Sequence, residues 1–509
     1  MPGSALCSVS GRRCLVIDMF LRRAVIVVGG SAAALFASVA VGKRDNDPVL
    51  PWTPIPTGSW NSNWDCREPM SLINLCELNE HELESQLQKY KAKAARHIFL
   101  IRHGKYHRHA NSKNYRSLTT RGREQADLTG KRLKLLDLKY NSIVHSSLPR
   151  ATETAEIIKQ YFPDVKITSS RVLEEGHPIQ PVPASPKWRP EFKYFEKGPA
   201  IEAAFRECIH RADPEQTKDS YEIIVCHANV IRYFVCRAVI TVGGSAAALF
   251  ASVAVGKRDN DPDLPWTPIP TGSWNSNWDC REPASLIDPS KQKDLNEWES
   301  LLQKHTAKAD RHIFLIRHGQ YNKADHDHDR TLTEKGREQA KLTGKRLKSL
   351  DLQFKSIVYS SLTRTTETAE IISRRLPDVG NTPSSLLHEG HPIRPVPECE
   401  WQPEHYYFQA GPRIEAAFRK YIHRAEPEQT KDSYEIIVCH DNVIRYFVCR
   451  ALQIPPDAWF RFELYHGSIS KLVIYADGNV SLQMLGEAGY MPPDKLTGLP
   501  VFQVTTVSL

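Results

Sequence analysis

The stretch His-Ile-Phe-Leu-Ile-Arg-His-Gly occurs twice in this chain, at residues 97–104 and 312–319. Each copy is a short apolar run that ends in Arg-His-Gly, and such a run is typical of a strand buried on both faces of a parallel sheet. Ligands of such sheets bind outside the carboxyl ends of the strands. At that edge an arginine can fork onto a phosphate and a histidine can act as a nucleophile. The alternative is an incidental basic pair after a buried strand.

The sequence around the second copy predicts an α/β domain, with a mostly parallel sheet and helices on both faces. We expect strands at 313–316, 356–359, 435–439, within 460–475 and at 481–485, and helices at 334–350, 363–375, 413–423 and 442–451. Thr333 is the expected N-cap of the first of these helices. The Pro- and Trp-rich linker before the first strand predicts no regular structure.

The chain is an internal duplication. Residues 24–73 recur as residues 238–287 with three differences, at 27/241, 49/263 and 70/284. Such closeness indicates a recent duplication, or a gene prediction that joins two tandem or alternative first exons. The second copy continues through the predicted strands after residue 460, whereas the first passes from Arg237 directly into the next apolar segment. We therefore predict that the first copy lacks its last strands, has an exposed sheet edge, and is less stable or inactive by itself.

Two apolar segments suggest contact with a membrane. Residues 24–42 and 238–256 carry no charge over about nineteen residues, which is near the minimum for a spanning helix. Residues 1–23 hold four arginines and a single acid, as in an organelle-targeting leader. An ordinary buried helix or a removed targeting segment is the alternative for these segments. The second segment is the weaker candidate for an anchor.

The predicted divisions of the chain follow from these features. They are a basic leader (1–23), a membrane anchor (24–42), a linker with an assembly motif (43–95), a first module without its last strands (96–237), a second apolar segment (238–256), a repeated linker (257–310), a complete second module (311–495) and a tail (496–509).

Composition excludes several classes of protein. The formal charge is +8, and the lysines and arginines are scattered without a zinc-finger or RNA-recognition signature. We therefore expect no nucleic-acid partner, whereas anionic phosphates or a membrane surface remain compatible with the charge. The eleven cysteines form no C-x-x-C pair, which indicates reduced thiols.

Further polar residues of the second copy are expected at the same sheet edge as Arg317 and His318. Arg364 lies in the first turn of a predicted helix, where it can help to hold an anion. Glu389 lies in a loop before a glycine, and His440 follows a predicted strand directly. The alternating Asp and His residues at 325–329 could suggest a metal site, but a solvated loop is the more economical interpretation.

The ordered set Leu-Ile-Arg-His-Gly, Ser-Ser-Leu-x-Arg, Glu-Gly and Cys-His resembles the histidine phosphatase, or phosphoglycerate mutase-like, superfamily in both copies. The resemblance implies that His318 is the nucleophile that becomes phosphohistidine and that Glu389 is the general acid. It implies a phosphate pocket of Arg317, Arg364 and His440. No cofactor and no metal is implied.

The same roles fall on the first copy. There the resemblance implies that His103 is the nucleophile and Glu175 the general acid. It implies a phosphate pocket of Arg102, Arg150 and His227.

The chain is most similar to mitochondrial serine/threonine protein phosphatases of this superfamily, through Arg-Glu-Pro-x-Ser-Leu-Ile and Asp-Ser-Tyr-Glu-Ile-Ile-Val-Cys-His. This implies a phosphatase anchored in the outer or inner mitochondrial membrane that hydrolyses phosphoserine and phosphothreonine in phosphoproteins. Two alternatives stay open. One is a phosphoglycerate-type mutase or small-molecule phosphatase, and the other is an oligomeric mitochondrial scaffold in which catalysis is secondary.

The repeated Trp-Asn-Ser-Asn-Trp-Asp looks like the multimerisation motif of these phosphatases, and paired aromatic residues outside a core are plausible interface anchors. The resemblance implies a homo-oligomer held through Trp60, Trp64, Asp65, Trp274, Trp278 and Asp279. The alternative is that the tryptophans cap their own module.

Overall fold

The computed structural model describes residues 64–65, 67–73, 80–107, 116–179, 181, 192–240, 274–287, 295–397 and 405–498. The predicted leader 1–23, the predicted anchor 24–42 and nearly all of the segment 238–256 lie outside these ranges. Among the described helices, none has the length and apolar character that crossing a bilayer requires.

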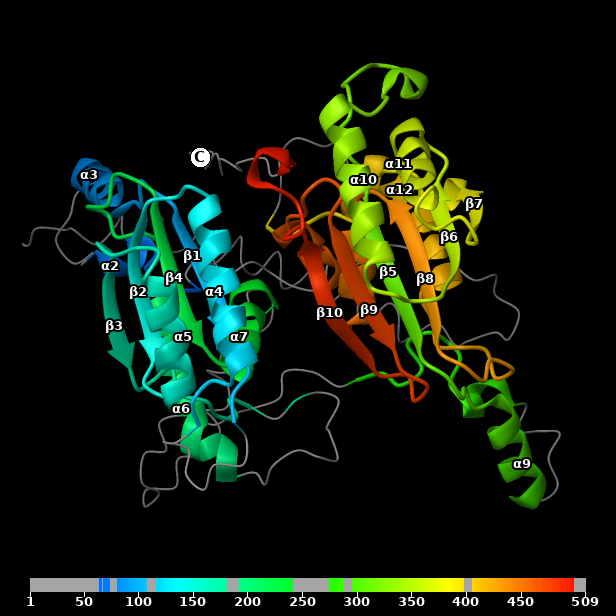
Figure 1. Cartoon of the computed structure of the whole chain (residues 1–509), viewed down its shortest axis with the longest axis horizontal. Coiled ribbons are helices and arrows are strands. Elements are labelled where there is room, and N and C mark those ends of the chain that lie inside the picture. Colours follow the sequence, from blue (N-terminus) through cyan, green and yellow to red (C-terminus); the bar gives the residue numbers. More distant parts are fainter. Residues whose placement is uncertain are drawn as a thin grey trace, which may run out of the picture. The chain divides into compact units, whose positions relative to one another are not determined.

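The second module, module 2, is built on a six-stranded sheet (Figure 1). Its order is β10-β9-β5-β8-β6-β7. Four strands are parallel, namely β5 (Arg311–Arg317), β8 (Ser433–Cys439), β6 (Phe354–Ser360) and β7 (Gly380–Ser384). The hairpin of β9 (Ile469–Ile474) and β10 (Val480–Glu487) covers the β5 edge, because β9 pairs antiparallel with β5. This confirms the predicted mostly parallel α/β fold.

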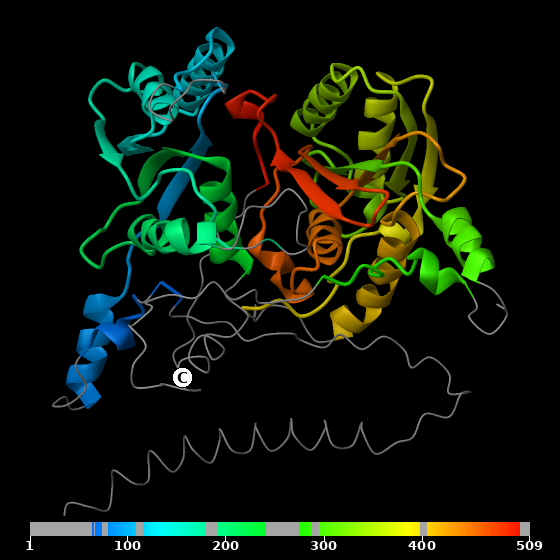
Figure 2. The same ribbon diagram turned by 90° about the horizontal axis from the view of Figure 1, so that it is seen from below.

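Helices cover both faces of this sheet (Figure 2). One face carries α10 (Glu334–Lys348) and α11 (Thr363–Ser373), whose Leu347 and Ile372 join a buried cluster around Phe314. The other face carries α12 (His405–Tyr421) and α13 (Asp441–Ala451). Thr333 caps α10 as predicted, since its hydroxyl accepts the Gly336 N–H at 3.0 Å. The short helices of this module are η7 (Asp327–Asp329), η8 (Ser385–Leu387), η9 (Pro456–Arg461) and η10 (Pro493–Lys495).

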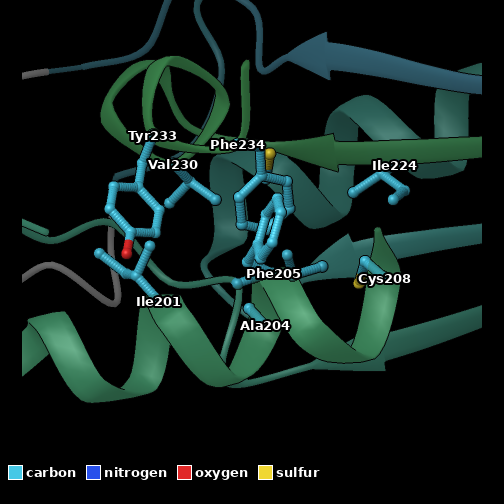
Figure 3. Packing of buried hydrophobic residues seen from close by; sticks show 10 residues of the cluster. Ile201, Ala204, Phe205, Cys208, Ile224, Val230, Tyr233 and Phe234 are labelled. Atoms are coloured by element: carbon cyan, nitrogen blue, oxygen red, sulfur yellow. The ribbon is translucent and has the colours of Figure 1, made fainter. Parts of the chain in front are cut away.

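The first module, module 1, has a sheet of four parallel strands in the order β1-β4-β2-β3. They are β1 (Arg96–Arg102), β4 (Ser220–Cys226), β2 (Tyr140–Ser146) and β3 (Lys166–Ser170). Helices α4 (Thr120–Leu135) and α5 (Pro149–Lys159) pack on one face. Helices α6 (Phe192–Cys208) and α7 (Ala228–Val235) pack on the other, and the π-helix η3 (Cys236–Ile240) follows α7. Phe205 of α6 and Phe234 of α7 meet in the centre of that second cluster (Figure 3).

Among the residues that the structure describes, module 1 has no counterpart of the hairpin that closes module 2, as the sequence predicts. Strands β1 and β5 have the same sequence, Arg-His-Ile-Phe-Leu-Ile-Arg. The four apolar residues of β5 are fully buried, at 0 % exposure, whereas those of β1 are only half-buried. The missing antiparallel neighbour accounts for the difference.

Three predictions of secondary structure are wrong. The linkers contain helices, namely α2 (Pro69–Leu72), α3 (Glu80–Tyr90), η5 (Pro283–Leu286) and α9 (Leu295–His305). The short α2 and η5 each begin at a proline, which is tolerated at the first helical position, and α3 and α9 contain neither proline nor glycine. Helix α12 begins at His405 rather than at residue 413. Its first turns bury Tyr407 and Ala410, which offsets the cost of Pro412 inside the helix. Only residues 469–474 of the predicted strand region 460–475 are a strand.

Strand β7 was not predicted, because Gly-Asn-Thr-Pro-Ser contains few strand-forming residues. It lies at the sheet edge, where a proline is tolerated since its missing N–H would face away from the ladder. The six cysteines that the structure describes are all free thiols, in agreement with the predicted reduced state.

Candidate active site

His318 lies at the carboxyl end of β5 in module 2 and is almost completely buried. Its backbone N–H donates to the Cys439 carbonyl at 3.1 Å, which ties it to β8. Its ring Nδ1 lies 2.8 Å from the Gly319 carbonyl. A carbonyl only accepts, so Nδ1 carries the proton and Nε2 is unprotonated. Gly319 is required here because a Cβ would lie 2.5 Å from the Gly336 carbonyl oxygen.

Arg364 joins the two histidines of the site. It lies in the first turn of α11 and is 3 % exposed. Its Nε donates to Nε2 of His318 at 3.3 Å, and its Nη2 lies 3.1 Å from Nδ1 of His440. The guanidinium also stacks 4.8 Å from the centre of the Tyr321 ring. The buried cation is thus fixed between two imidazoles, in the geometry of an anion pocket.

His440 and Glu389 form the other side of the pocket. His440 N-caps α13, and its Nε2 lies 2.9 Å from the Ser360 hydroxyl. Its Nδ1 lies 3.2 Å from Oε2 of Glu389, whose side chain is 30 % exposed. The two groups are thus within hydrogen-bond distance of each other at the mouth of the pocket. The backbone around Glu389 is held by Arg413, which donates to the carbonyls of Leu386, His388 and Glu389.

Arg317 is anchored from its outer end. Its Nη1 donates to the carbonyls of Leu464 and Gly498, and its Nη2 lies 3.1 Å from Oδ2 of Asp441. Its Nε is buried and has no hydrogen-bond partner among the residues that the structure describes. A buried unpaired donor is costly unless a ligand accepts from it, so the site has a donor available for an anion.

Burial sets the protonation of the histidines. Burial, with the nearby His440 and Arg364, holds the pKa of His318 well below its usual range. Burial also lowers the pKa of His440, although Glu389 acts in the opposite direction. Neutral imidazoles are therefore the resting form at neutral pH, and a neutral Nε2 is the form that can attack phosphorus.

Module 1 repeats this arrangement with few changes. Nε of Arg150 donates to Nε2 of His103 at 3.2 Å, and its Nη2 lies 3.2 Å from Nδ1 of His227. His227 lies 2.8 Å from the Ser146 hydroxyl and 3.5 Å from Oε2 of Glu175. Burial, followed by the charges of the neighbouring arginines, lowers the pKa of His103 to about 4, and burial raises the pKa of Glu175. The structure thus brings together four of the five residues predicted in module 1.

Arg102 is the exception. It is exposed at the end of β1, and among the described residues no carbonyl or carboxylate anchors its side chain in the way that Arg317 is anchored. Two of the anchors of Arg317 lie in the C-terminal part of module 2, which module 1 lacks. The third, Asp441, corresponds to Ala228.

Sequence reasoning missed three residues near the site of module 2. Asp327, in the acidic loop interpreted as solvated, accepts the Thr363 backbone N–H at 2.9 Å and lies 3.3 Å from Nη1 of Arg364. Asp441 pairs with Arg317, and the ring of His466 lies 5.6 Å from that of His318. The uncapped start of α11, with Leu362 at its N-cap, was a signal that a carboxylate was needed there.

The residues of each site could be mistaken for metal ligands. His318, Glu389 and His440 have donor atoms within 4.8 Å of one another, as do His103, Glu175 and His227. In both modules, however, an arginine donates to the ring nitrogens that a cation would need. A second positive charge at this position is disfavoured by Coulomb repulsion, and the donor set fits an anion better.

The tryptophan motifs contact their own modules. Trp278 is buried, lies 5.9 Å from the Phe418 ring and donates its indole N–H to the Gly478 carbonyl at 2.8 Å. Asp279 accepts from Arg424 in a buried ion pair. In module 1, Trp64 packs on Phe205, and Asp65 pairs with Arg211. Trp274 is half-buried, and Trp60 lies outside the described residues. These contacts fit the alternative that the motif caps its own module, and oligomerisation stays a prediction.

Comparison with known proteins decides the family. A sequence profile described as histidine phosphatase superfamily (branch 1) matches residues 98–250, 313–391 and 396–485, together more than half of the chain. The chain belongs to the histidine phosphatase superfamily. This confirms the family and the phosphatase class of enzyme that the motifs predict.

The relatives of this histidine phosphatase include proteins named serine/threonine-protein phosphatase PGAM5, mitochondrial. The Xenopus laevis protein is 54 % identical over 269 residues, which are 51 % of this chain and 98 % of that protein. The Homo sapiens protein is 53 % identical over 272 residues, 50 % of this chain and 94 % of that protein. Half of this chain thus matches almost a whole relative, as a tandem duplication requires. The mitochondrial part of their name agrees with the predicted location.

A solved structure to which the chain is similar is phosphoglycerate mutase from Plasmodium falciparum. It is 32 % identical, and the match covers 39 % of this chain and 99 % of that chain with a TM-score of 0.27.

Proposed function

We propose that module 2 hydrolyses phosphoserine and phosphothreonine esters in proteins through a phosphohistidine intermediate at His318, in a chain that is anchored in a mitochondrial membrane. The observation that supports this most directly is the unprotonated Nε2 of His318 beside Arg364, with an unpaired buried Nε on Arg317. The substrate class is inferred from the names of the relatives, which are serine/threonine-protein phosphatases.

In the first step, Nε2 of His318 attacks phosphorus and the bond between phosphorus and the serine or threonine oxygen breaks. The negative charge of the transferring phosphoryl group is spread over its oxygens, so fixed cations stabilise the transition state. Arg364 and Arg317 supply these cations. Glu389 supplies a proton to the leaving oxygen, which otherwise departs as an alkoxide.

In the second step, water attacks the phosphohistidine and the bond between phosphorus and Nε2 breaks. The carboxylate left on Glu389 takes a proton from this water, and inorganic phosphate leaves. Glu389 is suited to both steps because it is partly exposed and lies beside His440. Module 1 is proposed to have the same roles at His103, Arg102, Arg150, His227 and Glu175.

The test uses the full chain with a ³²P-labelled phosphoserine peptide. Acid-labile label should appear on the protein within a single turnover, and His318→Ala should remove most of the label and of the peptide hydrolysis. The double variant His103→Ala/His318→Ala should have neither. Unchanged hydrolysis in the double variant would refute the mechanism. Faster turnover of 3-phosphoglycerate than of the phosphopeptide would favour a mutase-type or small-molecule activity.

The membrane anchor and the divisions of the chain at residues 1–23, 24–42, 238–256 and 496–509 are likewise proposed. Alkaline carbonate extraction of mitochondria should leave the chain in the pellet if residues 24–42 anchor it, and deletion of these residues should release it. Protease protection of tags inserted in each module then tells whether residues 238–256 also span. Release of the intact chain by carbonate would refute the anchor.

A further inference from the structure

Module 1 contains a cavity beside the end of its first strand. It has a volume of about 700 Å³ and lies between the carboxyl end of β1 and helix α4. Its lining includes Arg102, His103, Lys105, Gln125 and Thr129. Arg102 is the last residue of β1, and β1 pairs only with β4 among the described strands. We call the cavity together with the outer edge of β1 the open groove.

The matching surface of module 2 shows what such a groove holds. Gln125 and Thr129 correspond to Gln339 and Thr343 of α10. The amide of Gln339 donates to the carbonyl of Lys495 and to the hydroxyl of Thr497 at 2.8 Å. The hydroxyl of Thr343 lies 2.8 Å from the Gly467 carbonyl. The C-terminal part of module 2 therefore fills this place with backbone carbonyls and a small residue.

The outer edge of β5 is also covered by the C-terminal part of module 2. In module 2 the edge of β5 is paired with β9 from Arg311–Ile474 to Ile316–Ile469, and the Arg317 N–H donates to the Ser468 carbonyl at 3.2 Å. Strand β1 has the identical sequence, half-buried apolar residues and no second partner among the described strands. An unpaired edge with half-buried apolar side chains is a template for an added strand.

We propose that the open groove of module 1 binds an extended polypeptide from another protein molecule, which adds an antiparallel strand to β1. The partner chemistry is that of residues 467–474, a glycine and a serine followed by a strand of mainly β-branched and aliphatic residues. The glycine lets the backbone approach Thr129, as Gly467 approaches Thr343. Gly467 has a φ of +72°, and a Cβ there would lie 3.2 Å from the Thr343 hydroxyl oxygen.

Binding of this kind would bury the half-exposed apolar residues of β1 and satisfy its free backbone groups. It would also bring carbonyl acceptors toward Arg102, where Arg317 has those of Leu464 and Gly498. The proposal concerns binding and stands whether or not module 1 is catalytic.

The experiment measures fluorescence anisotropy of a labelled synthetic peptide of residues 463–476 on the full-length chain. We expect saturable binding with a dissociation constant below about 100 µM. A peptide with Ile469→Pro and Leu472→Pro cannot form the ladder and should bind at least tenfold more weakly.

Two protein variants locate the binding. Thr129→Arg places a long side chain in the groove and should weaken binding at least tenfold. Leu128→Arg is the matched control, because Leu128 is 64 % exposed and is not part of the groove lining. If the peptide instead replaced strand β9 in module 2, its binding would not change with Thr129→Arg.

Several results would overturn the proposal. They are no saturable binding, equal binding of the proline peptide, or binding that Thr129→Arg leaves unchanged. Binding that appears only after removal of residues 499–509 would show that the chain's own tail occupies the groove, which overturns an external partner.

Discussion

Strands β1 and β5 have one sequence and two environments. In module 2 the strand is the third of six, paired on both sides and fully buried; in module 1 it is the edge of four and half-buried. The site at its end is nevertheless similar, because the distances between Arg150 or Arg364 and the histidine pair agree within 0.1 Å between the modules. The core of the pocket is therefore set by the parallel strands and α5 or α11, and does not depend on the hairpin.

The two sites differ in the shell that holds the pocket. Module 2 has Asp441, Arg413 and Asp327, and module 1 has Ala228 and Ala200 in place of the first two and no acid in the loop 107–118. Such supporting groups keep catalytic side chains within the narrow range of productive geometry. The comparison suggests that module 1 keeps a pocket but has lost much of its support, and the following predictions test this.

The largest expected difference lies between the two nucleophiles. His318→Ala should lower phosphopeptide hydrolysis by the full chain by roughly 1,000-fold or more, as loss of a nucleophile does. His103→Ala should change this hydrolysis less than about twofold, because Arg102 beside it is unanchored. Steady-state kinetics on both variants is the measurement. Equal losses of activity would mean that the two modules contribute equally, which would contradict the weaker support inferred for module 1.

Hydrogen exchange should show a difference of roughly 100-fold between the strands. The amides of β1 are expected to exchange faster than those of β5, because an edge strand with half-buried side chains opens by local fluctuations of low free energy. Mass spectrometry on peptides covering 96–102 and 311–317 compares identical sequences, which removes intrinsic exchange rates as a variable. Similar protection would show that the β1 edge is covered in solution.

Replacing Asp441 by the residue found in module 1 tests the support of Arg317. Asp441→Ala should lower kcat/KM about tenfold, because Arg317 loses an ion pair at 3.1 Å and becomes free to move. Burial raises the pKa of Asp441, but Arg317 and Arg445 outweigh this and leave it lowered, so the carboxylate is charged at the assay pH. The matched control is Ala228→Asp, which should leave total activity unchanged.

A smaller effect is expected from Asp327→Asn. The carboxylate lies beside Arg364 and competes with the substrate phosphate, whereas an amide still accepts the Thr363 N–H. KM should fall about twofold to fivefold at constant kcat, because less negative charge faces the phosphate. Asp325→Asn, on an exposed residue of the same loop, is the control. A raised KM would instead make Asp327 a contributor to substrate binding.

Acidification should destabilise both modules gradually. The pKa of His103 is lowered to about 4 and that of His227 to about 2 in the folded state, mainly by burial. The unfolded chain therefore takes up protons below about pH 6.5 while the folded chain does not, so stability falls with pH from there toward the folded pKa. Each such histidine costs about 1 kcal/mol at pH 5.5. His466, whose pKa is lowered to about 3, should steepen the loss in module 2. Thermal unfolding between pH 5 and 7.5 measures this, and a melting temperature independent of pH would contradict it.

Much of the site was readable in the sequence, because the motif residues sit next to strand ends. Arg-His-Gly follows an apolar run in each copy, and His227 and His440 follow Ile-Ile-Val-Cys directly, so the parallel sheet places them together without further information. Asp327, Asp441 and His466 were not readable in this way. Their contacts join segments far apart in the chain, and their local sequence has no pattern that separates a buried partner from a solvated acid or histidine.

The sequence by itself determined the duplicated parallel sheets, the histidine and arginine at each strand end, and the absence of the last strands from the first copy. Only the tertiary structure decided which side chains hold Arg317 in place, that the tryptophan motif packs on its own module, and that a cavity remains open beside β1. The reason is that strand and helix patterns arise from neighbours in the chain, whereas anchoring contacts and cavities depend on which distant segments come to lie beside them.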